Sequence, residues 1–538
     1  MFCQQCEETA RGIGCTAGGV CGKSNDTACY QDAVNFTLSG LAYRKIHQPS
    51  GAKVPADTAK QDKAVVEILF ATLTNVNFDK ERFREYLKIL IAYRDAYPKI
   101  PGEPKECSWI PKSEEEIIHL EGGIGLLAIE DDNERSLFSL LLFGLKGMCA
   151  YYSHAEVLGK IDPEMIVAFI YRGLASRFEK HTTEERTALV LECGKVGAKV
   201  LALLDEANKH YGTTEITKVH CGVRDKPGIL VTGHDLRDLE MLLEQTKGTG
   251  IDVYTHGEML IAHAHPAFKK YDNLIANYGT SWANQKDEFP KFNGPVLFTT
   301  NCLVPPPEEY RGRIFTTGSV GFDGAVHIPE RADGSKDFSE IIALARVCKA
   351  PTDLKLSEVT TGAGHDVVLT LAPKILKLIG EKKIRRFVVM AGCDGRHKER
   401  SYYTEFAKAL PKDVIILTAG CAKYRYNGLN LGDIDGIPRV LDAGQCNDSY
   451  SLVVIAQELA KALKVPVNEL PLSFNIAWYE QKAILVFLTL LALDIRDIMI
   501  GPYLPACISP DVLNTLVEKF DVQPNTTVEA DMKTLHLN

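Results

Sequence analysis

The spacing of hydrophobic positions divides the chain into a helical first part and two later parts in which strands and helices alternate. Within residues 26–209, apolar side chains recur every three to four positions, as in Phe83, Leu87, Leu90 and Ile91. Such spacing places the apolar side chains on one face of a helix. We therefore predict packed helix bundles for this part of the chain.

Beyond Tyr211 the pattern changes to short β-branched runs that end in glycine and lead into amphipathic segments. Residues 228–233 form such a run, and residues 236–245 follow it as an amphipathic segment. This alternation is typical of βαβ units and of a largely parallel sheet. The same pattern resumes at residues 387–390, after a helical stretch over residues 339–347.

These patterns predict a multidomain α and α/β fold with a domain boundary near Ala350. A helical-bundle domain that carries an N-terminal cysteine-rich loop is expected over residues 1–212. Two Rossmann-like α/β domains with mostly parallel sheets are expected over residues 213–350 and 351–538.

Six polar or thiol side chains come just after predicted strands, three in each predicted α/β domain. The carboxyl ends of parallel strands border a crevice in which ligands commonly bind. If the two sheets face one another across a cleft, these six side chains converge there as potential metal ligands. The six residues are His234, Glu258, Cys302, Cys393, Cys421 and Cys446.

Each of the six also has a purely structural interpretation. A single cysteine after a strand is most often a small buried apolar residue, and His234 and Glu258 can serve as cap or surface residues. Their shared position at six strand ends favours a metal site. The remaining cysteines lack such a setting, and we interpret them as structural or leave them open: Cys29, Cys107, Cys149, Cys193, Cys221, Cys348 and Cys507.

Composition and charge narrow the class of protein. The 538 residues are 45% hydrophobic and 24% charged, as in ordinary globular domains. A net charge of −9 argues against a nucleic-acid surface, and the longest apolar run, residues 483–493, is too short to cross a bilayer. Without a recognisable secretory signal we expect a cytoplasmic location, where 15 cysteines point to metal binding rather than to disulfides.

The first 21 residues contain four cysteines, Cys3, Cys6, Cys15 and Cys21, in the pattern C-x2-C-x8-C-x5-C. Glycines between them let a short loop wrap around a cluster that needs four converging thiolates. A zinc site usually has two C-x2-4-C pairs, and only Cys3 and Cys6 form one here. A disulfide knot is disfavoured by the expected reducing compartment. The spacing therefore favours an iron–sulfur cluster.

The motifs together resemble those of the hybrid-cluster proteins, also called prismane proteins or hydroxylamine reductases, which are distant relatives of the nickel–iron carbon monoxide dehydrogenases. The resemblance extends from Met1 to the C-terminal region. The motifs that carry it are Cys3-Gln4-Gln5-Cys6-Glu7, Gly233-His234-Asp235-Leu236, His256-Gly257-Glu258-Met259, Asn301-Cys302, Gly392-Cys393-Asp394-Gly395, Gly420-Cys421-Ala422-Lys423-Tyr424 and Gln445-Cys446-Asn447-Asp448.

The resemblance implies two clusters. The N-terminal cysteines would hold a [4Fe–4S] cluster of the anaerobe-type class. A hybrid [4Fe–2O–2S] cluster would be held by seven residues, with Cys393 as a persulfide. Those seven are His234, Glu258, Cys302, Cys393, Cys421, Cys446 and Glu480.

The activity implied by the resemblance is the reduction of hydroxylamine to ammonia and water, with electrons relayed by the N-terminal cluster. Glu258, Cys393, Glu480 and Lys482 are the candidate catalytic residues. Hard ligands such as Glu258 and Glu480 suit an open iron site that binds oxygen or nitrogen, and they argue against carbon monoxide oxidation.

Two alternatives stay open at this point. The same iron site would suit nitric oxide reduction, and Cys393 would suit a nitrosative-stress redox sensor or an S-nitrosylating protein. We expect a redox donor protein to dock near an exposed N-terminal loop that contains Arg11 and Lys23. We expect a monomer that binds neither nucleic acid nor membranes.

Overall fold

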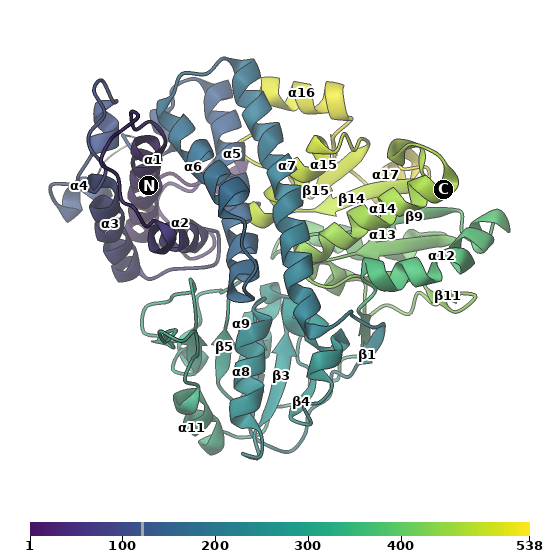
Figure 1. Cartoon of the computed structure of the whole chain (residues 1–538). Helices are drawn as coiled ribbons and strands as arrows, with labels where there is room; N and C mark the ends of the chain where they lie inside the picture. The colour runs from purple at the N-terminus through teal and green to yellow at the C-terminus, as the bar shows by residue number, and fades with distance from the viewer. Residues whose placement is uncertain (120–122, 538) are drawn as a thin grey trace.

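The structure is a computed structural model that describes residues 1–119 and 123–537. Figure 1 shows three groups of elements, with long helices running down the centre, one sheet below them and a second sheet at the side. No helix among the described residues is long and apolar enough to cross a bilayer.

The helical part agrees with the periodicity of the sequence. Its longest helices have defined starts, because Asp131 accepts a hydrogen bond from the Glu134 amide and Thr182 forms a capping box with Glu185. The helices are α1 (Asn25–Ile46), α2 (Ala59–Ala71), α3 (Lys80–Asp95), α4 (Glu114–His119), α5 (Asp132–Val157), α6 (Ala168–Ala175) and α7 (Thr183–Asn208).

The first α/β part contains a six-stranded parallel sheet in the order β4-β3-β2-β5-β6-β7. Its strands β2 and β3 are fully buried, which explains the apolar run of residues 229–231, whereas residues 252–256 are buried although they include an aspartate, a threonine and a histidine. The strands are β2 (Gly228–Thr232), β3 (Asp252–His256), β4 (Leu274–Asn277), β5 (Val296–Phe298), β6 (Ile314–Thr316) and β7 (Val326–His327). The helices are α8 (Leu236–Thr246), α9 (Gln285–Phe292), α10 (Glu308–Arg311) and α11 (Ser339–Val347).

The second α/β part contains another six-stranded parallel sheet, in the order β13-β10-β9-β14-β15-β16. The strands are β9 (Arg386–Val389), β10 (Val414–Thr418), β13 (Val440–Asp442), β14 (Leu472–Ala477), β15 (Ile498–Gly501) and β16 (Gln523–Pro524). The helices are α12 (His365–Gly380), α13 (Ser401–Ala409), α14 (Ser449–Leu463), α15 (Gln481–Ala492), α16 (Pro510–Phe520) and α17 (Val528–Thr534).

Two short antiparallel pairs complete the strand pairing. Strands β11 (Asp433–Ile434) and β12 (Ile437–Pro438) form a small hairpin. Strand β1 (Thr217–Val219), which precedes the first sheet, pairs with β8 (Val359–Thr361), which precedes the second. This pair ties the two α/β parts together. The two parallel sheets and the helical N-terminal part confirm the predicted fold class.

Helix α15 approaches α5 and α7 closely because glycines face it. A Cβ atom on Gly147 of α5 would lie 2.7 Å from the carbonyl oxygen of Gln481. A Cβ atom on Gly194 of α7 would lie 2.0 Å from the carbonyl oxygen of Leu488. These contacts seat the first turn of α15 deep between the helical part and the second sheet.

We expect Gly194→Ala to destabilise the protein by about 2 kcal/mol, because overpacking must push α15 away from α7. Thermal unfolding of the purified protein measures the effect. Gly312→Ala is the matched control, since nothing lies within 4 Å of the added methyl group. Equal unfolding temperatures for the two variants would contradict the close packing described for α7 and α15.

Candidate metal centres

The order of strands reverses near the middle of both parallel sheets, and predicted ligands lie at these points. In the first sheet β2 pairs with β3 on one side and β5 on the other; His234 follows β2 and Cys302 follows β5. In the second sheet β9 pairs with β10 and β14; Cys393 follows β9 and Glu480 follows β14. Reversal of strand order leaves a crevice beyond the strand ends in which ligands bind.

Three predicted ligands from the two α/β parts meet directly. The ligand atoms of His234, Glu258 and Cys446 all lie within 4.8 Å of one another, and all three residues are buried. His234 Nε2 is 2.7 Å from Glu258 Oε2 and 3.5 Å from Cys446 Sγ. The Cys446 amide donates to the same Glu258 oxygen at 2.8 Å. A nitrogen, an oxygen and a sulfur donor at this spacing can bind one metal centre.

Lys482 and Asn301 join further predicted site residues to this group. Lys482 Nζ lies 3.0 Å from His234 Nε2, 3.0 Å from Asn301 Oδ1 and 3.8 Å from Glu480 Oε1. Asn301 Nδ2 donates to Cys302 Sγ at 3.3 Å and lies 3.5 Å from Glu480 Oε1. Glu480 also caps α15 by accepting a hydrogen bond from the Lys482 amide at 2.7 Å.

Cys393 and Cys421 lie at adjacent strand ends of the second sheet. The Cys393 amide donates to the Ala477 carbonyl at 2.8 Å, and Arg400 Nη1 donates to the Cys393 carbonyl at 2.8 Å. The Asp394 amide donates to Cys421 Sγ at 3.0 Å. Hydrogen bonds from backbone amides to sulfur are a common feature of iron–sulfur sites.

The electrostatics of this site are dominated by buried acidic groups. Burial raises the pKa of Cys393 to about 12, and the Glu480 and Glu258 carboxylates raise it as well. Burial also raises the pKa of Glu480, although Lys482 opposes the shift. Burial disfavours charge on Glu258 too, but His234 and Lys482 outweigh it and hold the pKa of that carboxyl well below its usual range.

Lys482 is the cation at the centre of this group. Burial alone would lower the pKa of Lys482, but Cys446 and Glu480 raise it above its ordinary value. Cys302, Cys446, Glu258 and Glu480 therefore lie close enough to Lys482 for their charges to act on it, and Cys393 and Cys421 lie close enough to be affected by the charge of Glu258. Such a donor set fits a cationic metal cluster, because buried anionic groups need compensating positive charge.

The N-terminal loop forms the second group of thiols. Cys3 and Cys15 exchange backbone hydrogen bonds of 3.0 and 2.8 Å. A Cβ atom on Gly19 would lie 2.9 Å from Cys21 Sγ, so the loop passes close to this sulfur. Burial raises the pKa of Cys6, and negative charge on Cys21 and Cys3 raises it further. All cysteines of the chain are free thiols, so these four are available as ligands.

One expectation about this loop is wrong. Arg11 is exposed, but Lys23 is buried, with 3% of its surface exposed, and its Nζ donates to the side-chain oxygen of Gln31. Burial raises the pKa of Cys3, and the nearby Lys23 charge opposes that shift. Lys23 therefore compensates the charge of the thiols instead of offering a surface to a partner.

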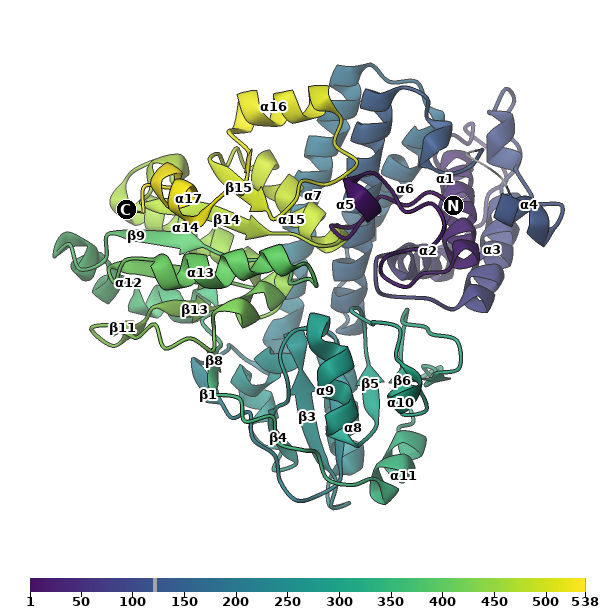
Figure 2. The same cartoon turned by 180° about the vertical axis from the view of Figure 1, so that it is seen from behind.

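The two thiol groups are joined by buried hydrogen bonds. The Glu7 amide donates to the Tyr479 carbonyl at 2.9 Å, directly before Glu480. The fully buried carboxylate of Glu7 pairs with Arg400 at 2.8 Å, and Arg400 also donates to the Cys393 carbonyl. Figure 2 shows the N-terminal loop, in dark purple, running beside α15. The positions of the two groups are thus mechanically coupled.

Sequence reasoning did not single out several residues that shape the site. Asn301 precedes Cys302 in one of the sequence motifs, but its position there does not indicate that its side-chain amide joins Cys302 to Lys482. Arg400 and Thr300 carried no sequence signal, because their contacts are made by distant segments. Thr300 Oγ1 lies 2.8 Å from His234 Nδ1 and so orients the imidazole.

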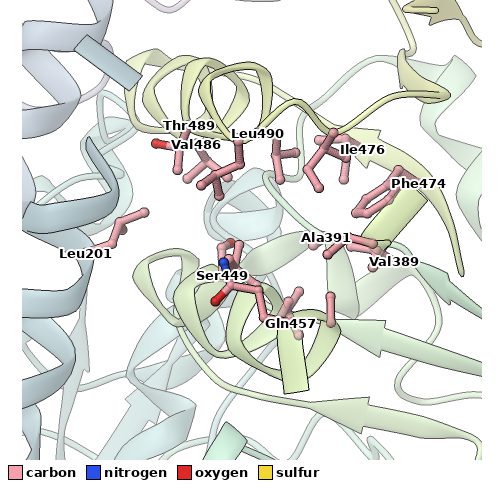
Figure 3. A pocket seen from close by; sticks show the side chains of 16 residues that line it. Leu201, Val389, Ala391, Ser449, Gln457, Phe474, Ile476, Val486, Thr489 and Leu490 are labelled. Atoms are coloured by element: carbon pink, nitrogen blue, oxygen red, sulfur yellow. The ribbon is translucent and has the colours of Figure 1, made fainter. Parts of the chain in front are cut away.

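An apolar cavity of about 90 Å³ lies between α14, α15 and the second sheet, near the strand end that precedes Cys393. Figure 3 shows its lining, with Val486 and Leu490 from α15 facing Ser449 and Gln457 from α14. Ala391, at its wall, is two residues from Cys393.

The fold and the donor set define an iron–sulfur protein with a helical part and two α/β parts. The chain belongs to the Prismane/CO dehydrogenase family, whose model matches residues 1–533. It is 53% identical to a hydroxylamine reductase of Methanosarcina mazei, over 99% of this chain and 100% of the relative. It is 52% identical to a hydroxylamine reductase of Thermoanaerobacter pseudethanolicus, over 99% of both chains.

Solved structures support the fold. A Ni-free carbon monoxide dehydrogenase from Thermococcus sp. AM4 superposes with a TM-score of 0.57 at 18% identity, covering 100% of this chain and 90% of that one. Carbon monoxide dehydrogenase IV from Carboxydothermus hydrogenoformans gives a TM-score of 0.55 at 16% identity, covering 99% and 92%. At such identities the likeness concerns the fold alone.

We expect Cys15→Ala to remove the spectroscopic signal of the N-terminal cluster and about half of the iron, because the two thiol groups lie in separate segments. Iron analysis and electron paramagnetic resonance of anaerobically purified protein measure both effects. Cys348→Ala, which removes a half-buried thiol outside both groups, is the control. Loss of all the iron from Cys15→Ala would contradict the division into two centres.

Proposed function

We propose that this protein is a hydroxylamine reductase, which cleaves the N–O bond with two electrons and two protons to give ammonia and water. The observation that carries the proposal is full-length similarity of 50–53% to relatives named hydroxylamine reductase. The mixed set of sulfur, nitrogen and oxygen donors supports it, since such a site suits nitrogen- and oxygen-bearing substrates. Nitric oxide reduction and a sensor role gain no support from the named relatives.

We further propose which residues hold the cofactors. Cys3, Cys6, Cys15 and Cys21 would bind a [4Fe–4S] cluster. The hybrid [4Fe–2O–2S] cluster would be bound by seven residues, with Cys393 as a persulfide. When bound, the iron centres supply the electrons and the Lewis acidity for breaking the N–O bond. The seven residues are His234, Glu258, Cys302, Cys393, Cys421, Cys446 and Glu480.

The chain's own residues would position substrate and protons. Lys482 Nζ and the Glu480 carboxyl lie 3.8 Å apart and are almost fully buried, so protons held on either group are shielded from bulk water. Asn301 orients both groups through its amide. We assign proton delivery to the leaving oxygen to Lys482, and a ligand role to Glu480, Glu258 and Cys393.

The expected partner is a redox donor protein that approaches the N-terminal loop. Arg11, Ile13 and Val20 are exposed there, with 68% of Ile13 and 50% of Val20 accessible, and they offer a mixed basic and apolar surface. We also propose a cytoplasmic location, because free thiols persist in reducing compartments. The division into domains over residues 1–212, 213–350 and 351–538 remains part of this proposal.

The proposal is tested by turnover of anaerobically purified protein with hydroxylamine and a reduced low-potential dye. We expect two dye equivalents to be oxidised for each ammonia formed, because the N–O bond accepts two electrons. Parallel assays with nitric oxide measure the main alternative. Absence of ammonia from a protein that contains both clusters would refute the proposed activity.

Replacement of two proposed site residues should abolish turnover while the fold persists. We expect Glu480→Gln and Cys393→Ala each to lower kcat by at least about 100-fold, because each changes a donor beside the substrate position. The N-terminal cluster signal and the circular dichroism should stay normal. Glu458→Gln, on the exposed side of α14, and Cys507→Ala, a buried thiol outside both sites, are the matched controls. Near-normal turnover in either site variant would remove that residue from the proposed site.

A further inference from the structure

A polar cavity of about 110 Å³ lies between the helical part and the first sheet, and it shares no lining residue with the apolar cavity. We call it the polar vestibule. Its walls come from α2, α5, the start of α8 and the segments that follow β5 and β6. Figure 1 shows α2 and the lower end of α5 above the first sheet, where these elements meet.

The outer part of the polar vestibule is rich in carboxylates. Glu67, Glu156 and Glu330 line it together with Lys63. Lys63 Nζ lies 3.8 Å from Glu67 and 3.2 Å from Glu330, so one cation is shared between two carboxylates. Glu67 and Glu330 are 45% and 39% exposed, which places them at the solvent end.

The inner end of the polar vestibule is formed by residues that contact the proposed ligand His234. His154 and Thr300 line it, and both contact His234. The His154 ring stacks on the His234 ring with centroids 5.8 Å apart and planes 9° apart, and Thr300 Oγ1 lies 2.8 Å from His234 Nδ1. His154 Nε2 is buried and has no hydrogen-bond partner among the residues that the structure describes. A buried, unpaired nitrogen in a polar cavity points to a small polar ligand or water beside it.

The two cavities differ in what they can accept. Hydroxylamine carries hydrogen-bond donors on nitrogen and oxygen, and it would lose these bonds in the hydrocarbon lining seen in Figure 3. The polar vestibule offers carboxylates, hydroxyls and an imidazole nitrogen instead, together with the cations of Lys63, Arg237 and Lys336. Its volume exceeds the roughly 30 Å³ that one liquid water occupies, so a molecule of this size fits.

We propose that the polar vestibule is the entry and holding site for hydroxylamine, with Glu67 and Glu330 at its mouth, Glu156 in its wall, and His154 and Thr300 at its inner end. The inference rests on the proposed activity, and it adds the path by which hydroxylamine reaches the proposed cluster site. Small polar nitrogen compounds that donate hydrogen bonds, including the protonated form of hydroxylamine, are the ligands that its carboxylates would favour.

The test narrows the passage without touching the proposed cluster ligands. Ser153 of α5 lines the polar vestibule and is half-buried, so Ser153→Leu places an isobutyl group in the cavity, whereas Ser153→Ala leaves it open. In the protein with both clusters, we expect Ser153→Leu to raise KM for hydroxylamine about tenfold while kcat at saturation changes less than about twofold. Ser153→Ala should match the wild type.

A second variant tests whether the negative charge of the polar vestibule helps to bind hydroxylamine. Glu156→Gln keeps the size of the side chain but removes a carboxylate, and we expect it to raise KM about threefold at unchanged kcat. If Ser153→Leu fails to fold, the Glu156→Gln variant still tests the inference, because an unchanged KM for hydroxylamine would contradict it.

Hydroxyl-radical footprinting provides a readout that is independent of turnover. Oxidation of His154 should fall at least about threefold in Ser153→Leu, because water is displaced from the cavity. Unchanged KM in a Ser153→Leu protein whose His154 is protected would overturn the inference and leave the proposed activity intact. A wild-type protein that contains both clusters but forms no ammonia would overturn both.

Discussion

The structure depends on the electrostatic cost of burying many acidic donors in one crevice. Four cysteines and two glutamates lie beyond the strand ends of two sheets, with Lys482 as the buried cation beside them. An unpaired buried charge is strongly unfavourable, and such a group either takes up a proton or binds a cation. Raised thiol pKa values, such as that of Cys393, report this conflict directly. A metal cluster resolves it by bringing the missing positive charge, so cluster binding and assembly of the three parts are linked processes.

The same constraint explains why the helical part belongs to the site. Helix α15 carries the first-turn lysine and fits against α5 and α7 only where glycines allow the backbones to approach. The N-terminal loop is held to the segment before α15 by the Glu7 amide and by the Glu7–Arg400 ion pair. Breaking one partner of a buried ion pair leaves an uncompensated charge that typically costs about 3–5 kcal/mol. Arg400 therefore couples the order of the loop to the order of the crevice, which suits two centres that must exchange electrons.

Two cavities with different linings lie near the site. One is lined by hydrocarbon from α14 and α15, and the other by carboxylates, hydroxyls and the unpaired His154 nitrogen. Cavities select small molecules by the hydrogen bonds they can replace. On this ground the polar cavity, in which the hydrogen bonds of hydroxylamine can be replaced, is the one proposed as its path.

The sequence by itself determined the fold class, the strands and the family. The predicted run over residues 228–233 contains β2, because a buried parallel strand needs a continuous apolar run. The position of thiol and polar residues at strand ends followed from the same local pattern. Only the tertiary structure decided which of these residues touch, that Asn301 bridges Lys482 and Cys302, and that Lys23 is buried. These facts depend on contacts between segments hundreds of residues apart, such as the Glu7–Tyr479 hydrogen bond. Periodicity in the sequence indicates which face of a helix or strand is buried. Which side chains lie against that face, and whether they compensate its charges, depends on residues that are far away in the sequence.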